Sequence, residues 1–150
     1  MTLIDYLTRT HFAEAAIEDA LPEEVGPLAR ALVLIDNEPG SATVCTRVQE
    51  SLGQTAISLV RTDRATPPEE ATLRILSAMS DIRTGTLIAV GGTAAVGQAR
   101  LAAEHALRRG ERLTLIAVPA GLCDFGLARR VRMGQGQPVA CPRPDRIIAD

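Results

Sequence analysis

The sequence predicts an α/β protein built on a parallel β-sheet, and two observations carry this expectation. Short apolar runs recur along the chain, and segments with the periodicity of an amphipathic helix lie between them. The 150 residues, 46% of them hydrophobic, suffice for one compact domain over residues 1–150, which would bury roughly two thirds of the surface of its unfolded chain. We therefore expect a single domain with helices packed against the sheet.

Five segments have the composition of strands. The first, residues 31–35, is the continuous apolar run ALVLI, as in a strand covered on both faces, and it ends at the turn sequence DNEPG. Similar runs predict strands over residues 56–60, 86–90 and 113–118, and a last strand over 146–149. Between them, the glycine-rich residues 120–143 have only weak periodicity.

Three helices are predicted between these strands. The first starts at Ser41 and ends at Gly53, with apolar residues repeating every four positions. The second starts at Thr66-Pro67-Pro68-Glu69, which has the form of a capping box with proline at the first helical position. The third runs from residue 93 to about 109, and its predicted buried side consists of Val96, Ala99, Ala103 and Leu107.

The composition excludes several classes of function. All 16 basic residues are arginine, so neither a Schiff-base lysine nor the lysine of a P-loop is present. A net charge of −2 and 2% aromatic residues do not indicate a nucleic-acid surface. No window has the ~20 apolar residues of a membrane span, and the N-terminus lacks the basic start of a signal peptide, so we expect a cytoplasmic protein without a membrane partner.

No residue has the sequence context of a catalytic or metal-binding group. The three cysteines, Cys45, Cys123 and Cys141, form no CxxC pair, and we expect them to be reduced packing residues. The two histidines, His11 and His105, lack a ligand spacing, so no metal is expected. No GxSxG turn is present either.

The segment LIAVGGTAAVG, residues 87–97, is the most informative stretch. A strand that runs through two glycines into a helix presents free backbone N–H groups and the positive end of the helix dipole, where an anion can bind. The pattern is not the GxGxxG of dinucleotide-binding proteins, however. Local chemistry therefore leaves two interpretations open, a phosphate-binding turn and an ordinary tight turn.

The order of these motifs resembles a known family. A strand ending in Asp36, LIAVGG before an alanine-rich helix, and the later strand LIAVP are similar to the N-terminal domain of the iron-containing alcohol dehydrogenase superfamily, and to maleylacetate reductase in particular. Weaker matches are residues 12–15, 118–121 and 147–150. The resemblance implies a Rossmann-like parallel sheet flanked by helices, as in dehydroquinate synthase-like N-terminal domains.

The resemblance also implies roles for particular residues. In that family the glycine-rich turn holds the pyrophosphate of a nicotinamide dinucleotide, and an acidic residue after the first strand binds the adenosine ribose. Asp36 has the position of the ribose-binding acidic residue, where a carboxylate favours NAD over NADP. The alternative interpretation is that Asp36 is an ordinary turn residue before Pro39 and Gly40. The positions that match the glycine-rich turn and its helix are Gly91, Gly92, Thr93, Ala94, Gly97 and Arg100.

Three of these positions depart from the family pattern. Thr93 replaces a glycine, Ala94 replaces a serine, and Arg100 stands where the family has lysine, so that Arg100 is alternatively a surface helix residue. Residues 120–126 retain little of the family segment that covers the nicotinamide. We expect these changes to weaken cofactor binding.

The family carries its metal ligands on a C-terminal helical domain that this sequence does not contain. We therefore expect a dinucleotide-binding domain that is not catalytically complete alone and that joins a separate helical subunit or self-associates through an apolar cleft face. Two alternatives remain open: a non-catalytic assembly or partner-binding protein, and a binder of a small phosphorylated metabolite.

Overall fold

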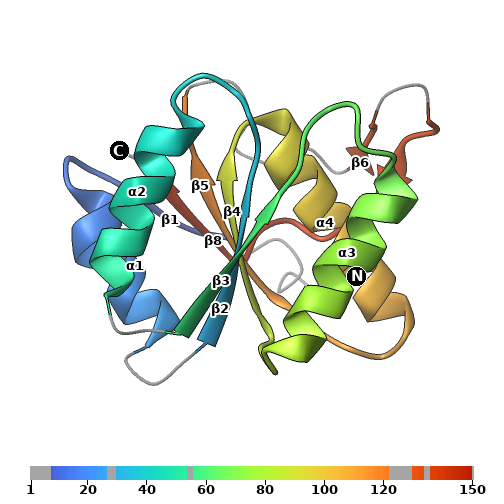
Figure 1. Ribbon diagram of the computed structural model, residues 1–150, viewed down its shortest axis with the longest axis horizontal. Helices are drawn as coiled ribbons and strands as arrows, with labels where there is room; N and C mark the ends of the chain where they lie inside the picture. The colour runs from blue at the N-terminus through green and yellow to red at the C-terminus, as the bar shows by residue number, and fades with distance from the viewer. Residues whose placement is uncertain (1–7, 27–29, 54–55, 122–129, 134–135, 150) are drawn as a thin grey trace.

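The computed structural model describes residues 8–26, 30–53, 56–121, 130–133 and 136–149. A six-stranded sheet forms its centre, with strand order β1-β8-β5-β4-β2-β3 and every neighbouring pair parallel. Helices cover both faces of the sheet, so the predicted Rossmann-like α/β fold is confirmed (Figure 1).

The central strands match the predicted ones closely. They are β2 (Arg30–Ile35), β3 (Ala56–Arg61), β4 (Thr86–Gly91), β5 (Thr114–Pro119) and, at the end of the chain, β8 (Arg146–Ala149). In β2, β4 and β5 every residue after the first is buried, as expected of parallel strands with helices on both sides.

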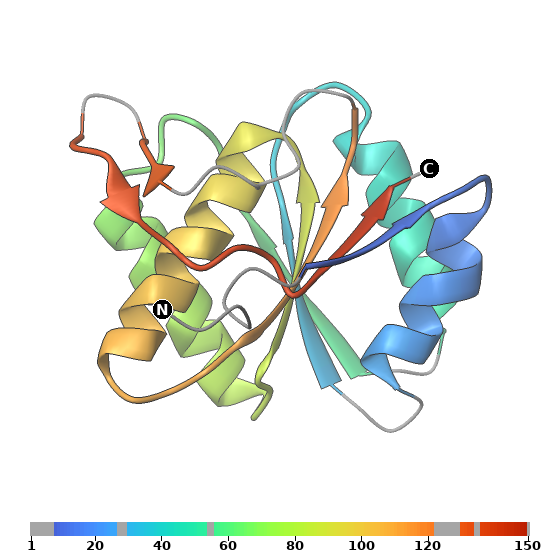
Figure 2. The ribbon, with the colours of Figure 1, turned by 180° about the vertical axis from the view of Figure 1, so that it is seen from behind.

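Helices α1 (Ala16–Val25) and α2 (Ser41–Leu52) pack on one face of the sheet. Helices α3 (Pro68–Asp81) and α4 (Thr93–Arg108) pack on the other face. Successive side chains of the central strands alternate between the two cores, since Leu32 and Leu34 face α3 and α4 whereas Val33 and Ile35 face α1 and α2. Figures 1 and 2 show the sheet between these two pairs of helices.

The first strand and helix were not predicted. The sequence of β1 (Arg9–Phe12) is polar because β1 is an edge strand whose pairing is with β8 alone. Helix α1 contains Pro22, and its N-cap is Ala15, which has a φ of 61° and no side chain that could cap the helix, so the sequence carries no signal of a helix start. The proline and the missing start signal explain why α1 was not predicted, although its buried face is apolar.

A short antiparallel hairpin of β6 (Arg130–Val131) and β7 (Val139–Ala140) was missed as well. Two-residue strands are too short for a periodic pattern to reveal them. The hairpin lies beside α4, as Figure 2 shows.

Two details of the predicted helices are wrong. The capping box does not form, because the Thr66 hydroxyl and amide both donate to Asp63 Oδ1, at 3.0 and 2.8 Å, and Pro67 is the N-cap of α3. Pro68 does begin the helix. Leu107 is 51% exposed, whereas Ala106 beside it is 1% exposed, because the buried side of the C-terminal part of α4 is formed by Ala99, Ala102, Ala103 and Ala106.

Candidate functional site

The candidate site lies at the carboxyl ends of β2 and β4, which are neighbours in the sheet. β2 continues into α2 on one face, whereas β4 continues into α4 on the opposite face. Neighbouring parallel strands whose connections leave on opposite faces form a crevice at their carboxyl ends, and α/β proteins bind ligands there. The predicted residues Asp36, Gly91 and Gly92 all lie at this place, which we refer to as the crevice, and all three are buried there.

Asp36 follows β2, and its buried carboxylate reaches the N-terminus of α4. One oxygen, Oδ2, accepts hydrogen bonds from the amides of Gly92 at 2.8 Å and Ala95 at 3.1 Å. The other, Oδ1, accepts from the Ser41 hydroxyl at 2.7 Å and from the Glu38 amide at 3.1 Å. We refer to these five residues as the Asp36 cluster. Each carboxylate oxygen has two donors, which uses the hydrogen-bonding capacity of the group.

The helix N-terminus explains why a carboxylate is stable in this buried place. The first amides of a helix have no partner within it, and the aligned peptide dipoles place about half a positive charge there. Gly92, the N-cap of α4, has no side chain that could accept from these amides. Asp36 therefore caps a helix that lies 56 residues further along the chain.

Gly91 is required by the position of Asp36. Its φ is +139°, and a Cβ atom added to it would lie 2.3 Å from Asp36 Oδ1 and 2.5 Å from Asp36 Cγ. Such distances are far below van der Waals contact, so a side chain at Gly91 would displace the carboxylate. The first glycine of the predicted phosphate-binding turn thus accommodates a group of the chain itself.

Two amides at the start of α4 have no acceptor in the described part of the chain, and only one of them belongs to a residue that solvent reaches. In the described part of the chain, the amides of Thr93 and Ala94 donate to no other group. The Thr93 residue is half-buried and Ala94 is fully buried. The crevice therefore retains unpaired donors next to the Asp36 carboxylate.

The remaining two predicted residues contact the C-terminal part of the chain. A Cβ atom at Gly97 would lie 2.8 Å from the Met133 sulfur, so this glycine allows the segment after β6 to approach α4. Arg100 is 2% exposed and donates to the carbonyls of Pro142 at 2.8 Å and Cys141 at 3.2 Å. Arg100 is thus not a surface residue, and it attaches residues 141–142 to the helix.

Gln98 is a residue that the sequence did not single out. It is fully buried on α4, and its amide group donates to the Asp63 carbonyl at 3.1 Å, while Thr62 donates to its side-chain oxygen. These bonds attach the loop between β3 and α3 to α4. An uncharged residue in an alanine-rich helix gave no signal of this role.

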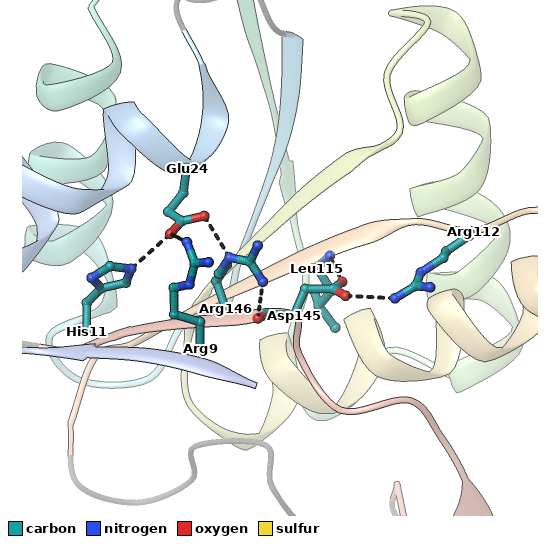
Figure 3. A network of polar contacts seen from close by, with 7 residues as sticks. All are labelled: Arg9, His11, Glu24, Arg112, Leu115, Asp145 and Arg146. Carbon is teal, nitrogen blue, oxygen red and sulfur yellow. Dashed lines mark hydrogen bonds and ion pairs between the residues drawn. The ribbon is translucent and has the colours of Figure 1, made fainter. Parts of the chain in front are cut away.

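A second carboxylate, which is half-buried, lies at the opposite, amino end of the sheet (Figure 3). Glu24 of α1 accepts from His11 Nε2 at 2.9 Å, from Arg146 at 2.7 Å and from Arg9 at 3.2 Å. Burial by itself would raise the pKa of Glu24, but the hydrogen bonds from His11, Arg146 and Arg9 outweigh it and lower the pKa from 4.5 to about 2. We refer to these four residues as the Glu24 cluster.

The described residues contain no group of three or more histidine, cysteine or acidic side chains that could hold a metal ion. His11 belongs to the Glu24 cluster, and His105 is exposed on α4. Cys45 and Cys141 are buried free thiols, and burial raises the pKa of both, that of Cys141 to about 11, which disfavours the reactive thiolate. Cys123 lies outside the described residues.

The segment after β5 is described only at its start. Ala120 donates to the Gly91 carbonyl at 3.0 Å, so residues 119–121 lie beside the crevice. Residues 120–126 correspond to the family segment that covers the nicotinamide, and of these, residues 122–126 lie outside the described residues. Within the parts of the chain that the structure describes, no helix has the length and apolar character needed to cross a membrane.

The fold is shared with solved oxidoreductase structures. An iron-containing alcohol dehydrogenase from Thermococcus thioreducens superimposes with a TM-score of 0.74 at 15% identity, over 93% of this chain and 44% of that one. The NADH-dependent butanol dehydrogenase A of Thermotoga maritima gives 0.71 at 15% identity, over 95% and 45%. Maleylacetate reductase from Rhizobium sp. strain MTP-10005 gives 0.68 at 22% identity, over 95% and 41%.

These matches confirm the predicted resemblance at the level of the fold. The chain spans less than half the length of each of these proteins, as expected of one domain of a larger enzyme. No protein-family model and no curated protein matches the sequence.

Proposed function

We propose that this chain is the dinucleotide-binding half of an oxidoreductase of the iron-containing alcohol dehydrogenase or maleylacetate reductase type, without independent turnover. The observation that carries the proposal is the crevice between β2 and β4, where a glycine pair precedes the N-terminus of α4. That arrangement occurs here within a fold shared with such enzymes.

The cofactor we propose is NAD rather than NADP. A negative charge after β2 disfavours a ribose 2′-phosphate, and Asp36 is the acidic residue in this place. Gly92 and the free amides of Thr93 and Ala94 are the groups that would face a pyrophosphate. A bound nicotinamide would accept or donate a hydride, while this chain would contribute binding and orientation.

The residues fit the pyrophosphate only in part. The Asp36 carboxylate already accepts from the amides of Gly92 and Ala95, and a phosphate at the same place would meet a negative charge. No reaction step is therefore assigned to the arrangement seen here.

Calorimetric titration with NADH and NADPH tests the proposal. We expect NADH to bind in the micromolar range, about tenfold more tightly than NADPH, and Gly92→Val to abolish binding because its side chain would cover the first amides of α4. The backbone of Gly92, with φ −106° and ψ −146°, lies outside the main regions that other residues adopt, so circular dichroism must show that Gly92→Val is folded before its binding is compared. Gly85→Val, at a position with open space around the added atom, is the matched control. Absence of binding at millimolar NADH would reject the proposal.

The proposal includes a partner. We propose that a separate helical subunit, or a second copy of this chain, covers the carboxyl edge of the sheet, and that the single domain works in the cytoplasm without nucleic acid or membrane. Phe12, 71% exposed at the end of β1, is an apolar group at that edge. Sedimentation analysis should show self-association or a stable complex; a monomer at every concentration, with and without NADH, would contradict self-association.

One observation favours a second candidate, a non-catalytic assembly protein that keeps the domain. The hydrogen-bonding capacity of Asp36 is used within the chain, and Gly97 and Arg100 contact the C-terminal segment. Stable assembly without any affinity for NADH would support this candidate over the first.

A further inference from the structure

We propose that Asp36 is an internal anion that keeps the crevice closed to phosphate groups, so that a dinucleotide binds fully only when this carboxylate leaves the N-terminus of α4. The inference deepens the proposed function, on which it rests. It names a residue that controls access to the site, which neither the fold nor the glycine pattern identifies.

The first argument is the competition for donors. A phosphate that enters between β2 and β4 needs the amides at the start of α4, because these are the groups that bind anions at such a turn. Asp36 Oδ2 lies 2.8 Å from the amide nitrogen of Gly92 and 3.1 Å from that of Ala95. The carboxylate thus has the bonds that a phosphate oxygen would make, and its charge repels a second anion.

The second argument is that the surrounding chain is shaped to the carboxylate. Asp36 is 4% exposed, and the Ser41 hydroxyl at 2.7 Å and the Glu38 amide at 3.1 Å hold its other oxygen. The missing side chain of Gly91 leaves the space in which the carboxylate lies. These contacts from separate segments define one position for Asp36.

Within the parts of the chain that the structure describes, the Asp36 carboxylate has no positively charged hydrogen-bond partner. In the described part of the chain, the bonding partners of Asp36 are three amides and one hydroxyl, with no arginine among them. A carboxylate held only by neutral donors and a helix dipole is replaceable by another anion, because the same donors serve any oxyanion. Removal of the carboxylate would leave four donors around one place: two amides at the start of α4, the Ser41 hydroxyl at the start of α2 and the Glu38 amide in the turn before α2.

The experiment compares wild-type protein, Asp36→Ala and Asp63→Ala by calorimetric titration with NADH and, separately, with inorganic pyrophosphate. Asp63 is a matched control because its carboxylate also accepts from backbone amides, those of Ala65 at 2.9 Å and Thr66 at 2.8 Å, but in the turn before α3. We expect Asp36→Ala to bind pyrophosphate and NADH at least about tenfold more tightly than wild type. Asp63→Ala should bind as wild type does.

A second readout is the thermal midpoint of unfolding. Pyrophosphate should raise the midpoint of Asp36→Ala more than that of wild type or Asp63→Ala at matched ionic strength, because the anion would replace the missing carboxylate. If Asp36→Ala does not fold, Asp36→Asn serves the same test, since it removes the charge while keeping the volume and one acceptor oxygen.

The outcomes separate this inference from the proposed function. Equal or weaker binding of both probes by the Asp36 variants overturns the inference, and weaker NADH binding would mean that Asp36 contacts the ribose as the resemblance implies. Tighter pyrophosphate binding without NADH binding by any variant supports the inference and rejects the proposed function. If no protein binds either probe, both are rejected.

Discussion

The protein holds two carboxylates at opposite ends of its sheet, and it stabilises them by different means. Asp36, at the carboxyl end of the strands, is surrounded by amides and a hydroxyl, whereas Glu24, at the amino end, is surrounded by arginines and a histidine. Neutral donors at a helix terminus can exchange one anion for another. Glu24 instead has two arginine side chains among its partners, so its contribution to stability depends on charge pairing, whereas that of Asp36 depends on backbone amides at a helix terminus.

The largest expected effect is at Gly91. Gly91→Ala places a methyl group 2.3 Å from Asp36 Oδ1 at a φ of +139°, and we expect it to lower the free energy of unfolding by about 3–5 kcal/mol. Urea unfolding followed by circular dichroism measures this loss. Gly85→Ala, with no atom within 4 Å of its added carbon, should change it by less than about 1 kcal/mol.

The double variant Gly91→Ala/Asp36→Ala sharpens this prediction. If the methyl group acts through the carboxylate, the two substitutions should be non-additive by about 1–3 kcal/mol, since the second removes the atoms that clash. Additive losses would mean that backbone strain alone makes glycine necessary at this position.

An intermediate effect is expected at the other carboxylate. Glu24→Gln leaves Arg9 and Arg146 without their counter-charge and weakens the hydrogen bond with His11, and we expect a loss of about 1–3 kcal/mol at pH 7 and low salt. Urea unfolding at increasing salt concentration should show this loss shrinking, because Arg9 is 63% exposed and its interaction is screened.

The pH dependence of the same variant has a defined sign. The pKa of Glu24 is lowered from 4.5 to about 2, so its stabilisation of wild type is present above pH 4.5 and is lost as the pH falls toward 2. The difference in unfolding free energy between wild type and Glu24→Gln should therefore shrink over that interval. A constant difference from pH 7 to pH 2 would contradict the lowered pKa.

The smallest effect is expected at an exposed ion pair. Glu18 accepts two hydrogen bonds from Arg47, both at 2.7 Å, but the Glu18 side chain is 42% exposed. We expect Glu18→Gln to change the free energy of unfolding by less than about 1 kcal/mol in the same urea assay. A loss as large as that of Glu24→Gln would show that burial is not what distinguishes these two glutamates.

The sequence predicted the central elements because each has a local signal. Residues 31–35 and 86–90 are continuous apolar runs, and Gly53 and Pro68 mark the end and the start of helices. β1 and α1 lack such signals, since one is a polar edge strand and the other contains a proline. The place of β1 is determined by its pairing with β8, more than 100 positions away, and that of α1 by its packing on α2 and β8.

The crevice was predictable in position but not in its contacts. Strand ends next to glycine indicate an anion-binding turn, and Asp36, Gly91 and Gly92 do meet there. The anion at this turn is the carboxylate of Asp36, a side chain of the same chain. It can reach the turn because β2 and β4 are neighbours in the sheet, and no local sequence pattern specifies that pairing. The burial of Arg100 likewise depends on residues 141–142, which lie about 40 positions further on.

The position of β8 has a consequence for the order in which the chain assembles. β8 lies between β5 and β1, and within the described residues β1 pairs with β8 alone. During synthesis on a ribosome, the first strand must therefore wait for the last one before it can join the sheet. The Glu24 cluster also needs Arg146 at the start of β8, so β1 and the C-terminal end of α1 are secured in the same late step as β8.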